Sequence, residues 1–242
     1  MGGGVGVSAH GSHRIVTERS KIAMPETGIG LVPDVGGTYL LAHAPDQLGI
    51  YFGLCGTSFG AASAIQAGFA DRFVSSDHIE ALIADLCVTQ ADDVPGVISR
   101  KASDPDPPVT DEYRSGIAEA FQYDQVEQCM EALHRISGAW SGKAITALSG
   151  RSPLALKLTL AAIRSAARLQ SVEEALNVEY RLTSRLLESG EFLEGVRAAI
   201  IDKDRQPKWN PPHLDGVTDA MVAGYFEPLT ADEELALSAP DS

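Results

Sequence analysis

The chain has 242 residues, of which 44% are hydrophobic and 21% charged, a composition typical of a globular protein with a substantial core. Its net charge of −14 at pH 7 argues against a nucleic-acid partner, because phosphate binding requires a basic face. The longest apolar runs are too short to span a bilayer, and glycines follow Met1 where a signal peptide would have a basic region. We therefore expect a cytoplasmic protein without a nucleic-acid or membrane partner.

The first hundred residues are predicted to alternate glycine-rich loops with short strands and helices. The chain opens with a cluster of glycines within residues 2–6. Pro25 ends an extended stretch, because proline cannot donate to a strand ladder, and a glycine-containing connector follows it. The predicted elements in chain order are strands over 13–17 and 21–24, a helix over 35–43, a helix over 61–67 and a strand over 70–74.

From Asp77 onward the pattern is mainly helical. Ser152 and Pro153 form an N-cap serine followed by a proline in the first helical turn. Ser171 and Glu174 have the spacing of a capping box, which also predicts the start of a helix. The predicted helices cover residues 79–88, 113–121, 125–136, 140–149, 154–167 and 172–187.

The segment 103–110 is rich in proline and aspartate and is predicted to be an exposed loop. We place a boundary there, between a sheet-containing region over residues 1–102 and a helical region over residues 111–242. Trp140 and Trp209 lie in the second region, and we interpret both as packing anchors between helices.

The cysteines and two nearby histidines do not form a recognisable site. Cys55, Cys87 and Cys129 are far apart and form no CxxC pair, so we interpret them as buried free thiols. His10 and His13 are three residues apart, but no third ligand accompanies them. We therefore expect neither a catalytic cysteine nor a bound metal.

The glycine run at residues 2–6 has more than one interpretation. Such a run is often a simple turn, but its backbone N–H groups can also bind a phosphate or a developing oxyanion. Gly4, Gly6 and Ala9 fit the G-x-G-x-x-A pattern of dinucleotide-binding loops. That motif must follow a strand, and no strand precedes it here. The sequence therefore disfavours a dinucleotide site.

Glu26 and Asp34 are the carboxylates that could carry chemistry. Pro25 is predicted to stop a strand and to present Glu26 at a turn. Apolar neighbours such as Met24 and Leu31 would raise its pKa, as a general acid or base requires. Asp34 lies eight positions later, and a glycine-containing loop between the two can fold both toward one site. The alternatives are a surface capping role for Glu26 and a helix N-cap role for Asp34.

Taken in order, these segments resemble the crotonase (enoyl-CoA hydratase/isomerase) superfamily, and more closely its 3-hydroxyisobutyryl-CoA hydrolase branch. The strings that carry the resemblance are MGGGVGVSAH, AMPETGIGLVPDVGG, SPLALKLTL and VEYRLTSRLLESGEFLEGVRAAIIDKDRQPKW. The resemblance implies an α/β fold, a partial crotonase (ClpP/crotonase-like) spiral followed by a helical C-terminal region. Family members carry further strands and helices before the glycine triplet. We therefore expect an N-terminally truncated member that is impaired or inactive on its own and that a complementing N-terminal fragment could restore.

The resemblance also implies roles for individual residues. Gly3 matches the glycine whose N–H contributes to an oxyanion hole, and Glu26 and Asp34 match the family's two acidic residues. Enoyl-CoA hydratases carry another glutamate soon after the triplet, whereas this chain has Gly6 there. That difference favours hydrolysis over hydration. The glycines implied to bind substrate are Gly2, Gly4 and Gly30.

The implied activity is hydrolysis of a short branched 3-hydroxyacyl-CoA thioester, with 3-hydroxyisobutyryl-CoA of valine catabolism as the expected substrate. Coenzyme A is then part of the substrate, and no cofactor is expected. We also expect assembly with copies of the same chain or with a complementing N-terminal fragment. The alternatives are an enoyl-CoA hydratase or isomerase, and a non-catalytic remnant that binds a partner chain or an acyl-CoA.

Three basic residues have two interpretations. By resemblance to crotonases, whose late basic residues often reach the CoA phosphates, Lys157, Arg164 and Arg197 could do the same. The alternative is that they form ion pairs with the abundant acidic residues on solvated helix faces.

Overall fold

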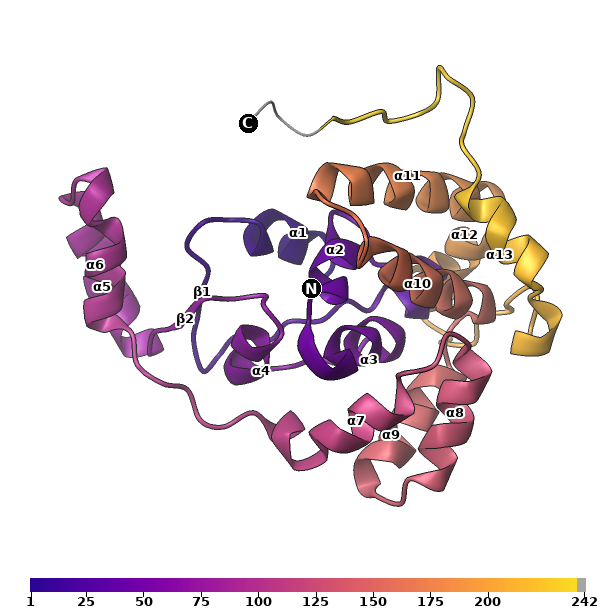
Figure 1. The fold of residues 1–242 in the computed structure, drawn as a ribbon, viewed down its shortest axis with the longest axis horizontal. Coiled ribbons are helices and arrows are strands. Elements are labelled where there is room, and N and C mark those ends of the chain that lie inside the picture. The colour runs from indigo at the N-terminus through magenta and orange to yellow at the C-terminus, as the bar shows by residue number, and fades with distance from the viewer. Residues whose placement is uncertain (239–242) are drawn as a thin grey trace.

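The computed structural model describes residues 1–238, and within this range it is mainly helical (Figure 1). Its two strands are β1 (Ile15–Val16) and β2 (Arg72–Phe73). The helices are α1 (Gly3–Ala9), α2 (Gly37–Ala42), α3 (Leu48–Cys55), α4 (Ala61–Gln66), α5 (Ile79–Cys87), α6 (Val94–Lys101), α7 (Arg114–Ala120), α8 (Val126–Arg135), α9 (Ala139–Ser149), α10 (Pro153–Ala166), α11 (Val172–Glu188), α12 (Glu191–Val196) and α13 (Asp219–Phe226). Figure 1 shows α5 and α6 at one end of the molecule and α10, α11 and α13 packed together at the other.

The small sheet is parallel and pairs segments that lie far apart in the sequence. Ile15 is in register with Arg72, and Val16 with Phe73. Beside the sheet, the Arg14 backbone N–H and Nε both donate to Asp71 Oδ2, at 2.9 and 3.0 Å. This ion pair fixes the beginning of β1 against β2.

The strand predicted over 21–24 is reduced to a single bridge. Ile22 and Phe59 form it, with backbone hydrogen bonds of 2.9 and 2.8 Å. The neighbouring Ala23 carbonyl instead accepts from the Gly2 N–H at 3.2 Å. The segment is extended, but its hydrogen bonds go to two different parts of the chain, so no ladder forms.

The main hydrophobic core contains residues from both sides of segment 103–110. The rings of Phe52 and Phe59 stack with centroids 4.0 Å apart, and Tyr51 contacts the ring of Phe121 in the second region. Trp140 stacks on Tyr113 with centroids 5.2 Å apart, which confirms it as a packing anchor. The predicted division into residues 1–102 and 111–242 stays a prediction.

The predicted helix caps are present, with one difference in detail. The Ser152 Oγ accepts from the Ala155 N–H at 3.0 Å, and the Ser171 Oγ accepts from the Glu174 N–H at 3.3 Å. The Glu174 carboxylate reaches back to the N–H of Gln170, one residue before the position that a capping box uses. Both helices begin where the sequence predicts.

Several expectations are corrected by the structure. Cys55 and Cys129 are buried free thiols as predicted, but Cys87 is exposed because α5 buries only one residue, Leu82. Thr110, placed in an exposed loop by the sequence, is buried. The sequence also missed the helices α1, α3, α6, α12 and α13.

Within residues 1–238, none of the helices combines the length and apolarity that crossing a bilayer requires.

Candidate functional site

Glu26 begins a 3₁₀ turn, η1 (Glu26–Ile29), so it lies at a turn as predicted, although the strand expected before it is reduced to the Ile22–Phe59 bridge. Gly30 closes the turn in the left-handed conformation, with φ of 69°. The Glu26 carbonyl accepts the Leu31 N–H at 3.0 Å. The Thr27 hydroxyl donates to the Leu54 carbonyl at 3.1 Å, and the Ser152 N–H donates to the Thr27 carbonyl at 3.1 Å. The turn is thus tied to both α3 and the start of α10.

Helix α12 packs directly against this turn because two glycines allow it. A Cβ on Gly195 would lie 2.2 Å from the Ile29 carbonyl oxygen, and a Cβ on Gly30 would lie 2.5 Å from the Glu191 carbonyl oxygen. Gly30 therefore serves both the left-handed turn and the close contact with α12. Its implied role in substrate binding stays a prediction.

The Glu26 carboxylate is almost completely buried, with a 4% exposed fraction. Burial raises its pKa to about 7, and the charges of Asp34 and Glu179 act in the same direction. A Cβ on Gly2 would lie 3.2 Å from Glu26 Oε1, while Oε2 is buried without a hydrogen-bond partner among the described residues. The predicted rise in pKa is confirmed. A carboxylate with this pKa can accept a proton near neutral pH.

Asp34 lies before α2 but does not cap it. The helix begins at Gly37, and its N-cap residue is Gly36, so the predicted helix start at residue 35 and the N-cap alternative for Asp34 are both wrong. Val35 and Gly36 adopt the left-handed conformation, with φ of 51° and 77°. A β-branched residue rarely adopts this conformation, so the turn needs support from its surroundings. Burial also raises the pKa of Asp34.

The first helix covers the Asp34 turn through a glycine. A Cβ on Gly6 would lie 2.3 Å from Val35 Cγ2 and 2.8 Å from the Val35 carbonyl oxygen. A Cβ on Gly36 would lie 2.3 Å from His10 Nε2, so the imidazole packs on the same turn. Position 6 therefore has no room for a side chain while Val35 stays in place.

The glycine triplet leads into α1. Gly2 has φ of 57° and precedes the first helical residue, Gly3. A Cβ on Gly3 or Gly4 would meet nothing within 4 Å. N–H groups in the first turn of a helix have no partner within that helix. The oxyanion role of Gly3 and the substrate-binding roles of Gly2 and Gly4 stay predictions.

Glu179 is a buried carboxylate that the sequence analysis missed. It lies on α11 with a 2% exposed fraction and accepts the Gly36 N–H at 2.7 Å and the Thr38 N–H at 2.9 Å. The Thr38 hydroxyl also donates to it, at 2.5 Å. Burial raises the pKa of Glu179 to about 7, against the opposing effect of these hydrogen bonds. The side chain that caps α2 is thus Glu179, from a distant part of the chain.

A sequence signal for Glu179 exists. The buried face of α11 consists of Ala175, Glu179, Leu182 and Leu186, which repeat at helical spacing. A carboxylate on an otherwise apolar stripe indicates a buried polar contact, because an unpaired charge would be costly there.

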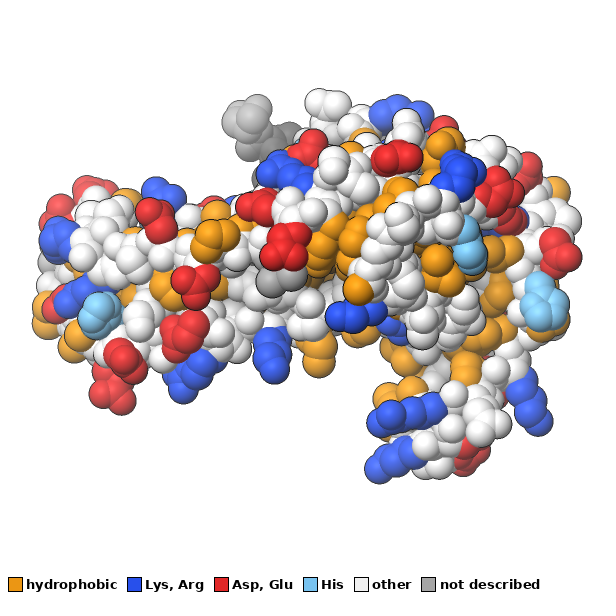
Figure 2. Space-filling model, turned by 90° about the horizontal axis from the view of Figure 1, so that it is seen from below, with side chains coloured by type: hydrophobic (Ala, Val, Ile, Leu, Met, Phe, Trp, Pro, Cys, Tyr) orange, Lys and Arg blue, Asp and Glu red, His pale blue; other side chains and the backbone are white. Residues whose placement is uncertain are grey.

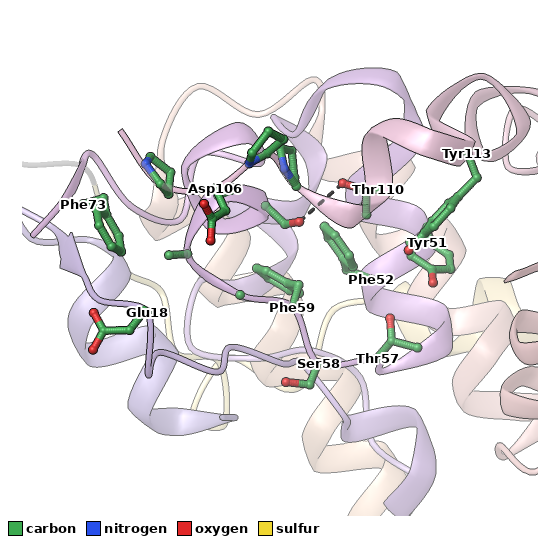
Figure 3. Close-up of a pocket in the computed structure, with 17 residues that line it drawn as sticks. Glu18, Tyr51, Phe52, Thr57, Ser58, Phe59, Phe73, Asp106, Thr110 and Tyr113 are labelled. Carbon is green, nitrogen blue, oxygen red and sulfur yellow. Dashed lines mark hydrogen bonds between the residues drawn. The ribbon is translucent and has the colours of Figure 1, made fainter. Parts of the chain in front are cut away.

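A cavity of about 420 Å³ lies elsewhere in the molecule (Figure 3). Aromatic and proline side chains line it together with the hydroxyl groups of residues such as Thr57 and Thr110. Its charged lining residues are Glu18 and Asp106, and neither Lys nor Arg is among the described residues that line it. Because its described lining lacks basic residues, the cavity is unsuited to CoA phosphates. Glu26 and Asp34 are not among its lining residues.

The ion-pair interpretation of the three basic residues is confirmed. Lys157 Nζ lies 2.6 Å from Glu127, and Arg164 Nε lies 3.0 Å from Asp124. Arg197 contacts Glu194, Asp202 and Asp204, the nearest Glu194 oxygen at 2.8 Å. Charged side chains of both signs are likewise interspersed on the face that Figure 2 shows.

The described part of the chain offers no group of three or more His, Cys, Asp and Glu residues that could hold a metal ion. His10 packs against Gly36, and the His13 ring hydrogen-bonds to the Ser12 hydroxyl at 2.9 Å.

Comparisons with known proteins give a consistent picture. A family model described as enoyl-CoA hydratase/isomerase matches residues 1–226. The chain is 35% identical to a mitochondrial 3-hydroxyisobutyryl-CoA hydrolase of Dictyostelium discoideum, with 97% of this chain and 63% of the relative covered. It is 39% identical to the mitochondrial enzyme of the same name from Rattus norvegicus, with 95% and 61% covered. The chain thus spans about three fifths of the length of these curated relatives.

Two solved structures are similar throughout the chain. A carnitinyl-CoA dehydratase from Mycobacterium thermoresistibile is 43% identical with a TM-score of 0.90, covering 97% of this chain and 66% of that one. An enoyl-CoA hydratase from Rhodobacter sphaeroides is 39% identical with a TM-score of 0.89, covering 98% and 68%. The predicted fold class is confirmed by this similarity.

Proposed function

The chain belongs to the enoyl-CoA hydratase/isomerase family, and we propose that it hydrolyses the thioester of a short branched 3-hydroxyacyl-CoA, with 3-hydroxyisobutyryl-CoA as substrate. The observation that carries the proposal is the combination of a buried Glu26, with a pKa of about 7, and a position 6 that cannot hold a second carboxylate. The names of the curated relatives support the same reaction.

In the proposed reaction, Glu26 is the general base. It removes a proton from a water molecule whose oxygen attacks the thioester carbonyl carbon, and the Gly3 N–H stabilises the resulting oxyanion. Collapse of the tetrahedral intermediate breaks the C–S bond and releases CoA thiolate, which takes up the proton. Asp34 orients the water. The products are the 3-hydroxy acid and CoA.

The proposal includes no metal ion or redox cofactor, because hydrolysis consumes only water and CoA is part of the substrate. The relatives from Dictyostelium and rat are named as mitochondrial proteins, so their names do not support the cytoplasmic location expected from the sequence. That location stays a prediction, as do self-assembly and a complementing fragment.

A second candidate function is hydration of an enoyl-CoA. It is favoured by the names of the two similar structures, a dehydratase and a hydratase. Water addition across a double bond in hydratases uses two cooperating carboxylates, and Val35 fills the space beside Gly6 where the second would stand. We therefore prefer hydrolysis. The binding-only alternative differs from both because it predicts acyl-CoA binding without turnover.

Two assays separate these functions, run on the purified chain alone and together with a complementing N-terminal fragment. Free CoA released from 3-hydroxyisobutyryl-CoA is followed with a thiol reagent, and crotonyl-CoA hydration is followed by loss of the enoyl absorbance. We expect CoA release by the wild type and a loss of about 10²–10⁴-fold in Glu26→Gln, since a general base contributes that much. Crotonyl-CoA hydration without CoA release would establish the hydratase instead. Binding of acyl-CoA with neither reaction would establish the binding-only alternative.

A further inference from the structure

The buried side chain of Glu179, on α11, supports the Asp34 turn through hydrogen bonds. The two hydrogen-bonded backbone groups, Gly36 N–H and Thr38 N–H, lie on either side of Gly37, where the turn passes into α2. The Thr38 hydroxyl supplies a third donor to the same carboxylate. One side chain therefore fixes the direction in which the chain leaves the turn.

Among the described residues, no cation forms an ion pair with Glu179. None of the ion pairs found among residues 1–238 includes this carboxylate, although it is 2% exposed. A buried carboxylate is unfavourable unless its oxygens are well satisfied, and here backbone and hydroxyl donors alone do this. An apolar residue would complete the stripe of α11 at lower cost, so stability of the helix alone does not explain a glutamate.

The other side of the turn is closed by tight contacts. Val35 lies against Gly6 and Gly36 lies against His10, both from the N-terminal segment. A Cβ on Gly37 would lie 2.4 Å from Met24 Cε, so the beginning of α2 packs on the segment that leads into Glu26. The turn is thus clamped between the Glu26 segment, α1 and the Glu179 carboxylate.

The clamp acts on a turn that its own residues disfavour. Val35 is left-handed, and without external hydrogen bonds its preferred backbone would be extended. Relaxation of Val35 would rotate the peptide that follows Asp34 and move the Asp34 carboxylate. Asp34 is close enough to Glu26 to raise its pKa, so such a movement would alter the environment of the proposed base.

We propose that Glu179 is a positioning residue, which holds the Val35–Gly36 turn in its left-handed conformation and thereby fixes the position of the Asp34 carboxylate relative to Glu26. It touches neither the proposed water nor the thioester. The proposal rests on the function proposed above for its kinetic consequences, but the holding of the turn is independent of that function.

The test uses the Glu179→Gln variant with Glu188→Gln as a matched control, because Glu188 is an exposed glutamate on the same helix. Glutamine keeps the size of the side chain, but its NH₂ group cannot accept a hydrogen bond from a backbone N–H. Amide hydrogen exchange at Gly36 and Thr38 reports the turn directly. We expect faster exchange at Gly36 in Glu179→Gln, with unchanged exchange in α10, and wild-type exchange in the control.

Kinetics report the effect on Asp34 and Glu26. We expect kcat for CoA release to fall about 10²-fold in Glu179→Gln, as displacement of a catalytic group by about 1 Å can produce, with KM changed less than about threefold. The charges acting on Glu26 are those of Asp34, Glu179 and the N-terminal amino group. Removal of the Glu179 charge should therefore also move the acid limb of the pH profile to lower pH, which a loss of folded protein would not do.

Each outcome decides the proposal. Faster exchange at Gly36 with an unchanged kcat would show that Glu179 holds the turn but does not position the reactive groups, and would overturn it. Unchanged exchange at Gly36 would overturn it as well. If the wild type hydrolyses no thioester, the proposed function fails on its own. The exchange data, together with the Asp34 pKa measured by carboxyl NMR in wild type and variant, then decide the positioning.

Discussion

The turns that carry Glu26 and Asp34 lie close together in the first forty residues but are supported in different ways. The Glu26 turn is held by several backbone and hydroxyl contacts to α3 and α10 and by close glycine contacts with α12. The Asp34 turn depends mainly on one carboxylate, Glu179 of α11. A site can thus combine a rigid base with a second acid whose position one side chain controls.

The C-terminal helices supply a buried glutamate at each turn, but the two carboxylates make different hydrogen bonds. The Glu179 carboxylate accepts directly from the Asp34 turn. Glu191, 4% exposed, accepts a hydrogen bond from the Ser152 hydroxyl at 2.5 Å, and the Ser152 N–H then contacts Thr27 in the Glu26 turn. The C-terminal helices therefore support both of the turns that carry Glu26 and Asp34.

The largest expected effect on stability comes from the burial of Glu26. Its pKa rises from 4.5 to about 7 on folding, so the folded state binds the proton more tightly than the unfolded state. Its contribution to stability is fully present below about pH 4.5 and is lost as the pH rises through 7. In Glu26→Gln, the free energy of unfolding should lack the change of about 3 kcal/mol between low and high pH that the titration of Glu26 contributes. Urea unfolding at pH 4 and pH 8 measures it, and an equal difference between variant and wild type at both pH values would contradict the burial.

The Gly195→Ala substitution in α12 should disturb the Glu26 turn. The new Cβ would lie 2.2 to 2.5 Å from backbone atoms of Ile29, which cannot move without displacing the turn. We expect a loss of about 2 kcal/mol in the free energy of unfolding, within the range for overpacking, and slower CoA release. The control is Gly142→Ala in α9, where a Cβ would meet nothing within 4 Å. Equal stability of the two variants would contradict the close packing of α12 on the turn.

The Asp34 turn can be disturbed from the opposite side with Gly6→Ala. The clash falls mainly on the Val35 side chain, which can yield in part, so we expect a loss of about 1 kcal/mol in unfolding free energy. Val35→Gly should suppress most of this loss in the double variant, because it removes the two nearest clashing atoms, Cβ and Cγ2, and glycine tolerates the left-handed backbone. A double-variant cycle measures the coupling, and strictly additive effects would contradict the contact.

An effect as small as that of Gly6→Ala is expected from Thr38→Val, which removes one of the three donors to Glu179 and leaves both backbone donors in place. Loss of a single hydrogen bond of this kind should lower the unfolding free energy by about 1 kcal/mol. Thermal unfolding beside Glu179→Gln measures it. If Thr38→Val were the more damaging of the two, the hydroxyl rather than the backbone contacts would hold the turn.

The sequence predicted the elements whose signals are local. The start of α10 follows from the serine and proline at residues 152 and 153, and the apolar neighbours of Glu26 correctly predicted its raised pKa. Helix α3 was missed because all eight of its residues are buried, which leaves no amphipathic pattern, and because it contains two glycines. Gly49 is needed there since a Cβ would lie 1.8 Å from the Leu41 carbonyl oxygen, a contact that only the folded structure reveals.

The candidate site was predictable in its carboxylates but not in its support. Glu26 and Asp34 were identified from short motifs and from the resemblance to crotonases. Glu179 lies 143 residues from its partner Gly36, so no local pattern joins them. The left-handed backbone of Val35 was equally hidden, because valine normally indicates an extended or helical residue.

The most direct test of the account is the rate of CoA release from 3-hydroxyisobutyryl-CoA measured across pH 5 to 9 for the wild type and Glu26→Gln. If Glu26 is the base, kcat/KM should rise with an apparent pKa of about 7, and CoA release should be lost in the variant at every pH. A rate that does not change with pH, or one that survives in Glu26→Gln, would contradict the central claim.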